Sequence, residues 1–574
     1  MSRKISILLA ESVALYLLLC PHAFAATEVS DEAKQQLVSQ AESFRKEAKP
    51  PSLEEEEKPE IVVEEKEEPE PKEEGPKFFV KKIRLEGNTV FSEEDLRPLI
   101  SPFENKEQSF ASLANLSAAI TNTYRAKGYL TSRAYIPPQK VENGTVTIKI
   151  LEGKIDKIFV EANRFFKKSL YSKMIHLRKD RIFQYQDLES SLYFLNQQPD
   201  RKAKAYLIAG ETPQTSDIIL KADEKYPIHV YYEFNNRGTK LTHRARHTIH
   251  ADNNNFSGNG DTFASSLGMA EEGAFTAASV NYDLPIEETG TDLGLSFSHV
   301  DTMLIGHLKP SEVKGQSISF TPSITQTLVK RPSLLFNIYL GFEIKDSKTL
   351  VDDIKINFDR SRAFVLGPRL TFQDTGGRTL LSSDAHWGIP DFLGSNEEVD
   401  PNASKTNSGG DFLYYTGSVA RIQRIPPDSY LIVRGAGQWT KDTLSSLEQY
   451  RAGGAFTVRG YPESDSSGDY GFNASAELNM PVPFLPKDWE MPFNKKKWRD
   501  VVRLAGFVDG ARTYIRERTN SVDVKDRFLL GLGFGIRVNI DSSVSFQADL
   551  GYPLGDKSTD ENQKQVHISL RVGF

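Results

Sequence analysis

Cysteine is almost absent from this sequence. The 574 residues contain one cysteine, Cys20, and it lies in an N-terminal segment that we expect to be removed. The mature chain then has no disulfide bond, no thiolate zinc site and no thiol nucleophile.

Motifs for catalysis and for cofactors are also missing. The ten histidines form no H-E-x-x-H arrangement, and the chain has neither a G-x-S-x-G elbow nor a Walker loop. We therefore expect no catalytic residue, no metal and no cofactor, and we predict that the protein is not an enzyme. Nucleic acid is not among its expected partners.

Long apolar runs are confined to the N-terminus. Residues 1–25 combine a basic start, a mostly apolar core from Ile5 to Cys20 and an Ala23-Phe24-Ala25 cleavage site, which is the pattern of a signal peptide. A membrane anchor is the alternative, but Glu11 interrupts the run. No later stretch approaches twenty apolar residues, so an exported chain of this kind is either soluble or crosses a membrane as a β-barrel.

Negative charge is concentrated in one segment. The net charge is −7, and residues 54–77 alone hold twelve Glu against four Lys, a net of −8. Proline punctuates the same stretch, so we interpret residues 50–77 as an extended, self-repelling linker with no core of its own.

A candidate amphipathic plug helix precedes this linker in residues 26–49. Ser30 suits a helix N-cap, and apolar residues follow at helical spacing, namely Leu37, Val38, Ala41 and Phe44. A disordered tail with helical bias is the alternative.

Two copies of a small α/β unit follow the linker. Residues 78–153 predict the order strand, helix, helix, strand, strand, and residues 154–225 repeat it. Each unit should expose short sheet edges, where an extended peptide could add as a further strand.

Helical periodicity disappears from about residue 226 onward. About sixteen alternating segments of roughly ten residues recur between Gly, Asn, Asp, Ser and Pro clusters up to residue 574. An even number of such segments is typical of a transmembrane antiparallel β-barrel, with a soluble β-sandwich as the alternative.

The last strands separate an apolar face from a polar one. In residues 566–574 every second residue is apolar up to the terminal Phe574, while Arg571 lies on the other face. In residues 530–539 Gly531, Gly533 and Gly535 alternate with large apolar residues, so these glycines should leave room along the lumenal wall.

One loop is predicted to fold into this barrel. Residues 442–471 carry Val458-Arg459-Gly460-Tyr461 between glycine-rich turns. The charged face of residues 502–509 should be lumenal, so Asp509 is a carboxylate within reach of Arg459, and Glu477 is a competing partner.

Several of these motifs resemble one family. Val458-Arg459-Gly460-Tyr461 is similar to the sixth-loop motif of the Omp85 superfamily, and Phe507-Val508-Asp509 resembles its partner motif on a later strand. Gly128-Tyr129-Leu130 and Leu195-Asn196 resemble patterns of POTRA modules. Over residues 78–574 the chain resembles the two-partner-secretion transporters, which include haemolysin and filamentous-haemagglutinin secretion proteins.

The resemblance has two departures and several implications. Ala511 and Asn235 stand where the family usually has glycine and aspartate. The resemblance implies two periplasmic POTRA modules, a sixteen-stranded outer-membrane barrel, a secreted exoprotein client exported without ATP, and contact with outer-membrane lipid. It also implies insertion by the barrel assembly machinery through Phe574, and a monomer. An Omp85-type factor that inserts other outer-membrane proteins is the alternative function.

Overall fold

The computed structural model describes residues 59–63, 76–161, 164–175, 177, 181–212, 214–287, 289–492, 496–516, 526–540, 544–560 and 563–573. The predicted signal peptide (1–25), the candidate plug helix (26–49), most of the acidic linker (50–77) and Phe574 lie outside these residues.

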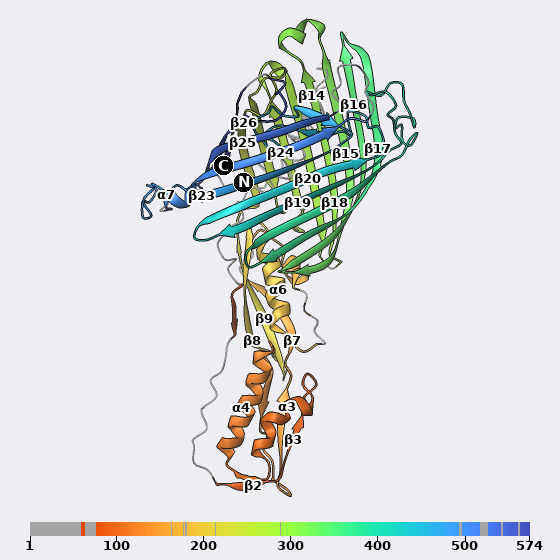
Figure 1. Ribbon diagram of the computed structural model, residues 1–574. Helices are drawn as coiled ribbons and strands as arrows, with labels where there is room; N and C mark the ends of the chain where they lie inside the picture. The colour runs from red at the N-terminus through yellow and green to blue at the C-terminus, as the bar shows by residue number, and fades with distance from the viewer. Residues whose placement is uncertain are drawn as a thin grey trace.

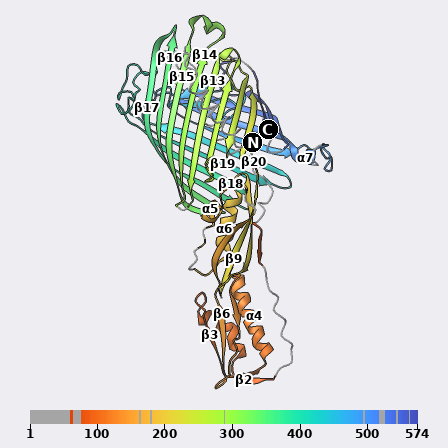
Figure 2. The ribbon, with the colours of Figure 1, turned by 180° about the vertical axis from the view of Figure 1, so that it is seen from behind.

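The molecule is elongated. A β-barrel occupies one end, and the two α/β modules follow it in line, the second module next to the barrel and the first module farthest away (Figures 1 and 2). Within the described part of the chain, no helix has the length and apolar character needed to cross a bilayer.

The first module packs two helices on a small sheet. Its core consists of buried apolar residues such as Ile83, Leu96, Ile120 and Ile148. Strands β3, β6 and β5 form one sheet, and β2 pairs with β4. The elements are β2 (Phe78–Val80), β3 (Lys82–Glu86), α3 (Glu93–Ile100), β4 (Lys106–Gln108), α4 (Phe110–Ala126), β5 (Arg133–Tyr135) and β6 (Thr145–Leu151).

The second module repeats the two helices and the three-stranded sheet, and its sheet has one additional strand. A three-residue strand from the acidic linker, β1 (Ile61–Val63), joins its sheet, whose order is β1-β8-β9-β7. The sequence prediction of a linker without structure missed this strand. Its signal is the β-branched triplet Ile61-Val62-Val63 inside a run of charges. The other elements are β7 (Lys154–Glu161), α5 (Lys168–Met174), α6 (Tyr185–Asn196), β8 (Arg201–Ala209) and β9 (Thr215–Glu224).

Polar contacts tie the second module to both neighbours. Its Tyr185 N–H donates to the Gly128 carbonyl of the first module at 2.8 Å. On the barrel side, Asp200 lies 2.8 Å from His229 and accepts from Asn254 at 2.7 Å. The module is therefore held against the barrel end that receives the chain.

The barrel is closed, and its neighbouring strands are antiparallel, which confirms the predicted fold and the count of sixteen. The strands are β10 (Ile228–Asn235), β11 (Arg246–Asn253), β12 (Thr262–Met269), β13 (Phe275–Ile286), β14 (Thr291–Met303), β15 (Lys314–Arg331), β16 (Leu334–Val351), β17 (Ile354–Asp374), β18 (Gly377–Gly388), β19 (Leu413–Ile425), β20 (Ser429–Thr440), β23 (Tyr470–Pro481), β24 (Val502–Tyr514), β25 (Asp526–Asn539), β26 (Val544–Pro553) and β27 (Gln565–Gly573).

Three strands are far longer than the predicted length of roughly ten residues. β15 and β16 have 18 residues each and β17 has 21. The sequence placed the start of β17 near Arg362, eight residues late, because Arg360 opposite Asp346 breaks the apolar alternation while the strand ladder continues.

The two faces of the barrel wall differ in chemistry. Large apolar side chains such as Leu267, Leu532 and Phe534 are more than half exposed on the outside. Their neighbours on the inner face are small or charged, and Ser266 and Asp549 are buried there. This alternation suits a wall with lipid outside and a polar lumen inside.

A buried carboxylate stabilises the first module. Glu152 accepts hydrogen bonds from the N–H groups of Thr89 (2.7 Å) and Val90 (2.8 Å) and from the Tyr124 hydroxyl (2.8 Å). Burial alone would raise the pKa of Glu152, but these hydrogen bonds outweigh it and hold the pKa below its usual value of 4.5. The ionised form therefore stabilises the fold above that value, and the contribution is lost as the pH falls through the lowered pKa.

We expect Glu152→Gln to destabilise the first module by about 1–3 kcal/mol at neutral pH, because Gln forms weaker hydrogen bonds at this site. Urea titration of the full chain, read by protease cleavage within residues 78–153, measures the change. The exposed Glu142→Gln is the matched control. The difference in unfolding free energy between the variant and the wild type should shrink below pH 4.5. A difference that stays constant with pH would contradict the role of the Glu152 charge.

Candidate functional site

The candidate site is the loop that joins β20 to β23, residues 441–469. It contains the short strands β21 (Tyr450–Ala452) and β22 (Ser466–Gly468), which pair with each other. The loop folds inward, so that Val458 and Tyr461 at its tip are fully buried. Gly460 has a φ of +105°, a conformation that an L side chain rarely adopts, and this turn directs Arg459 toward the wall.

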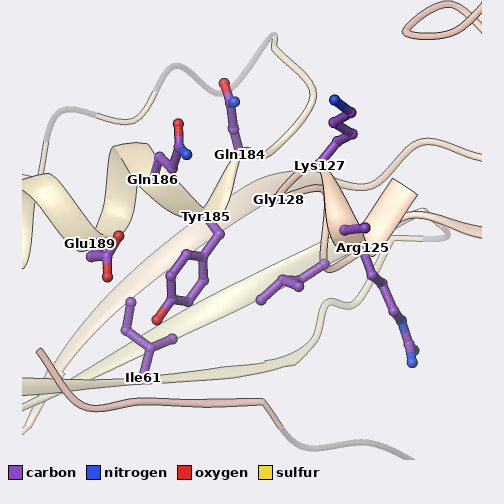
Figure 3. A pocket seen from close by; sticks show the side chains of 10 residues that line it. Ile61, Arg125, Lys127, Gly128, Gln184, Tyr185, Gln186 and Glu189 are labelled. Carbon is purple, nitrogen blue, oxygen red and sulfur yellow. The ribbon is translucent and has the colours of Figure 1, made fainter. Parts of the chain in front are cut away.

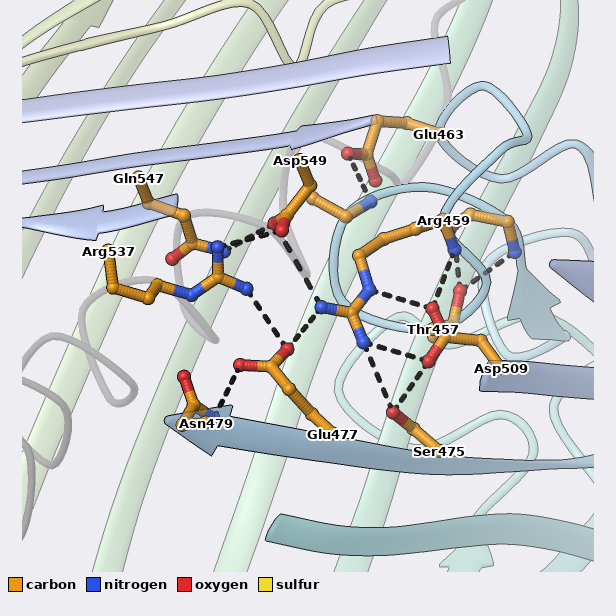
Figure 4. A network of polar contacts seen from close by, with 12 residues as sticks. Thr457, Arg459, Glu463, Ser475, Glu477, Asn479, Asp509, Arg537, Gln547 and Asp549 are labelled. Atoms are coloured by element: carbon orange, nitrogen blue, oxygen red, sulfur yellow. Dashed lines mark hydrogen bonds and ion pairs between the residues drawn. The ribbon is translucent and has the colours of Figure 1, made fainter. Parts of the chain in front are cut away.

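Arg459 is bound by two strands at once (Figure 4). Its Nε and Nη2 donate to the carboxylate of Asp509 on β24 at 2.7 and 2.9 Å, and its backbone N–H donates there at 3.1 Å. Its Nη1 donates to Glu477 on β23. The guanidinium also lies 3.5 Å from the ring centroid of Phe507.

The sequence left Asp509 and Glu477 as competing partners, and the structure brings both to Arg459. The two are not equivalent, because Asp509 receives three hydrogen bonds from this residue and Glu477 receives one. Ser475 also donates to Asp509 at 2.6 Å. Asp509 is therefore the main anchor of the tip.

Sequence reasoning missed two members of this network. Arg537 on β25 donates to Glu477 at 3.0 Å and to Asp549 on β26 at 2.7 Å. Asp549 also lies 3.9 Å from Arg459. Both occupy inward positions of alternating strands, which is the signal that could have identified them. Two guanidinium groups thus meet three carboxylates, a net charge of −1 when all are ionised.

The glycines of the wall accommodate this network. A Cβ at Gly531 would lie 2.0 Å from the Arg459 carbonyl oxygen, so the loop backbone rests directly on that residue. A Cβ at Gly533 would meet the Phe507 ring and one at Gly535 would meet the Asp549 carboxylate. The glycine face therefore makes room for the loop at Gly531 and for its binding partners at the other two positions.

Apolar and polar contacts hold the rest of the tip. Val458 and Tyr461 pack with Leu529 and Ala511 in a small buried cluster. The Tyr461 hydroxyl donates to the carbonyl of Asp556 at 3.0 Å and accepts from the Gly555 N–H at 3.0 Å. The side chains on both sides of Arg459 in the motif are therefore buried against the wall.

The loop reaches the opposite wall as well. Glu448 accepts from Lys345 on β16 at 3.0 Å and from Tyr414 on β19 at 2.8 Å. Strands β16 and β26 are the seventh and fifteenth in the ring of sixteen, eight positions apart. Because Arg459 approaches Asp549 on β26, the loop crosses the full width of the lumen.

Asp469 secures the base of the loop. It is fully buried and accepts from Lys405 at 2.8 Å through both oxygens, from the Leu444 N–H at 3.0 Å and from the Arg516 N–H at 2.7 Å. The base, middle and tip of the loop each rest on a buried carboxylate. This arrangement can hold a segment of chain across a channel.

The described residues contain no group of three or more His, Cys, Asp or Glu side chains that could hold a metal ion. The lumenal network pairs arginines with carboxylates, which suits positioning of the loop.

Comparison with known proteins finds families and solved structures that this chain resembles. Residues 78–153 match the family described as POTRA domain, ShlB-type, and residues 214–496 match haemolysin secretion/activation protein ShlB/FhaC/HecB. The heme/hemopexin transporter protein HuxB of Haemophilus influenzae (strain 86-028NP) is 23% identical over 84% of both chains. The outer membrane transporter CdiB of Dickeya dadantii is 22% identical over 87% of both. The solved structure of CdiB from Escherichia coli superimposes with a TM-score of 0.67 at 19% identity, and covers 96% of this chain and all of CdiB.

We expect Arg459→Ala to release the tip of the loop. The substitution removes the guanidinium that binds Asp509 and leaves Glu477 and Asp549 with Arg537 alone. Loss of one partner of a desolvated ion pair costs roughly 3 kcal/mol. Hydrogen exchange of residues 453–463 in the folded barrel should become on the order of 100-fold faster. Arg512→Ala, which removes an exposed ion pair with Asp526 on the outer side of β24, is the control. Unchanged protection of the tip would refute the anchoring role.

The loss of exchange protection caused by Asp509→Asn and by Glu477→Gln should follow the number of hydrogen bonds that each carboxylate accepts from Arg459. We expect the Asp509 variant to lose more protection in residues 453–463 than the Glu477 variant, because Asp509 also receives the backbone N–H. The same exchange experiment measures both. The reverse order would make Glu477 the principal partner.

Proposed function

The chain belongs to the haemolysin secretion/activation family of two-partner-secretion transporters in the bacterial outer membrane, and on this premise we propose that it exports one specific large exoprotein. The observation that carries the proposal is the loop that crosses the lumen with its tip bound at Arg459. A channel filled by a removable segment suits a transporter that opens for one client.

The proposed route begins in the periplasm. The unfolded client adds an extended segment to the sheet edges of the POTRA modules, which lie directly beneath the barrel (Figure 1). The Arg459 loop and the predicted plug segment (26–49) then shift, and the client passes through the lumen in extended form. Family relatives carry different names, heme/hemopexin transporter and CdiB, so the client of this chain has to be identified by experiment.

The direction of transport is proposed to come from folding of the client outside the cell. The outer membrane has no ATP, and the sequence has no Walker motif. Once the client folds outside, its return through a narrow lumen is unfavourable. This scheme requires neither an enzyme activity nor a cofactor.

Further partners follow from the barrel itself. The outward apolar side chains contact outer-membrane lipid, and the C-terminal Phe574 serves as the signal by which the barrel assembly machinery inserts the chain. We propose that the protein works as a monomer, because a closed barrel leaves no unpaired strand edge.

The alternative is an Omp85-type factor that inserts other outer-membrane proteins. The architecture favours the transporter, because the described chain has two modules before the barrel, whereas assembly factors of the superfamily usually carry three to five.

The two functions predict different losses when the gene is deleted. We expect one large exoprotein to disappear from the culture medium while the outer-membrane proteome stays unchanged. Quantitative mass spectrometry of both fractions, with the gene restored from a plasmid as the control, makes the comparison. A joint fall of many outer-membrane proteins would identify an assembly factor and contradict the proposal.

A further inference from the structure

The outer edge of the second module is already occupied by the chain itself. Strand β1 (Ile61–Val63) pairs with β8 in parallel, with Ile61 opposite Ala205 and Val62 opposite Tyr206. The Ala205 N–H donates to the Glu60 carbonyl at 3.1 Å. Figure 1 shows this strand beside β8, at the flank of the module. A segment of the acidic linker thus adds to the sheet as a bound peptide would.

The side chains of this segment match the edge that they cover. Ile61 packs against the apolar core of the module. Glu60 forms an ion pair with Lys204, the residue of β8 before Ala205. Both partners of that pair are more than half exposed, so the pair contributes to specificity more than to stability. An acidic residue followed by β-branched residues is therefore the pattern that this edge accepts.

A cleft of about 770 Å³ lies beside the segment, at the junction of the two modules. Ile61 and Tyr185 face each other across it, and Arg125, Lys127 and Gly128 at the end of α4 close the far side (Figure 3). A strand that replaced β1 would place its own side chain at the Ile61 position on this cleft. The free volume accepts a side chain larger than isoleucine.

From these contacts we infer that residues 60–63 act as an internal competitor for the client, and that the client docks as a strand parallel to β8 after displacing them. The docking strand carries an acidic residue opposite Lys204 and a large apolar residue at the Ile61 position. This inference rests on the proposed function, because it assigns the edge where the client binds.

The occupant is suited to displacement. Only three residue pairs hold it, and a short strand on an edge is marginal without further strands. Its attachment to the same chain nevertheless gives it an effective concentration in the millimolar range, so it excludes weak, unspecific peptides. A client with more paired residues can win this competition.

The first test uses the chain alone and needs no client. We expect a synthetic peptide of residues 57–66 to bind the full-length Val62→Pro variant. Its affinity for the wild type should be lower by on the order of tenfold or more. The Glu60 carbonyl points toward β8. Because the backbone of a strand repeats every two residues, the Val62 N–H points toward β8 as well. The substitution to proline removes this hydrogen-bond donor. Equal binding to both proteins, or to neither, would overturn the inference.

The second test locks the occupant in place. A disulfide between Val62→Cys and Tyr206→Cys would join the two residues that lie opposite each other, and Cys20 lies in the predicted signal peptide, so it adds no competing thiol to the mature chain. The exoprotein found by the deletion experiment is the probe. We expect its secretion to fall at least tenfold under oxidising conditions and to recover with reductant.

The matched control is Tyr206→Cys with Ile219→Cys, which links β8 to its inner neighbour β9 and leaves the outer edge free. This pair should secrete normally when oxidised. Normal secretion by the oxidised Val62–Tyr206 pair would overturn the competitor role while leaving the transport function intact. If deletion of the gene removes no exoprotein, the proposed function itself fails, and the peptide experiment still reports on the edge.

Discussion

The ion-pair network around Arg459 is the constraint on which the rest of the barrel's interior depends. A guanidinium group buried in the lumen requires carboxylates close by, and the wall supplies them on β23, β24 and β26. Arg459 can reach these carboxylates only because β25 presents glycine at position 531. Any side chain at Gly531 would displace the loop backbone at Arg459. The loop, the charges and the glycines therefore form one unit that lies across the lumen.

At the periplasmic end, as in the lumen, a segment of the chain itself occupies a place where the client could bind. The lumen is crossed by a loop of the chain, and the edge of the second POTRA module is covered by a strand of the chain. Both occupants are held by directional contacts of modest extent: charge-assisted hydrogen bonds at the loop tip, and three strand pairs at the edge. A client that engages the edge and then the lumen would replace internal contacts with similar ones of its own, which suits transport without an external energy source.

Much of this architecture could be predicted from the sequence, and the failures have physical causes. Period-two alternation identified all sixteen strands, because lipid on one side and water on the other force it. The same signal failed at residues 354–361, where Arg360 interrupts the apolar face and pairing alone sustains the strand. The motif residues Arg459 and Asp509 could be named. Arg537 and Asp549 were missed, because alternation shows that each points inward but does not reveal which charges on nearby strands it meets. Strand β1 was missed because its pairing with β8 joins residues more than 140 positions apart.

The most direct test of the account is client secretion by an Arg459→Ala protein that still inserts into the outer membrane. Quantifying the exoprotein in the medium, with Arg512→Ala as the control at equal barrel abundance, decides the matter. We expect secretion to fall at least tenfold in the Arg459 variant and to stay normal in the control, because only the first loses the bound tip of the loop. Normal secretion by the Arg459 variant would show that the lumenal network braces the barrel and takes no part in transport.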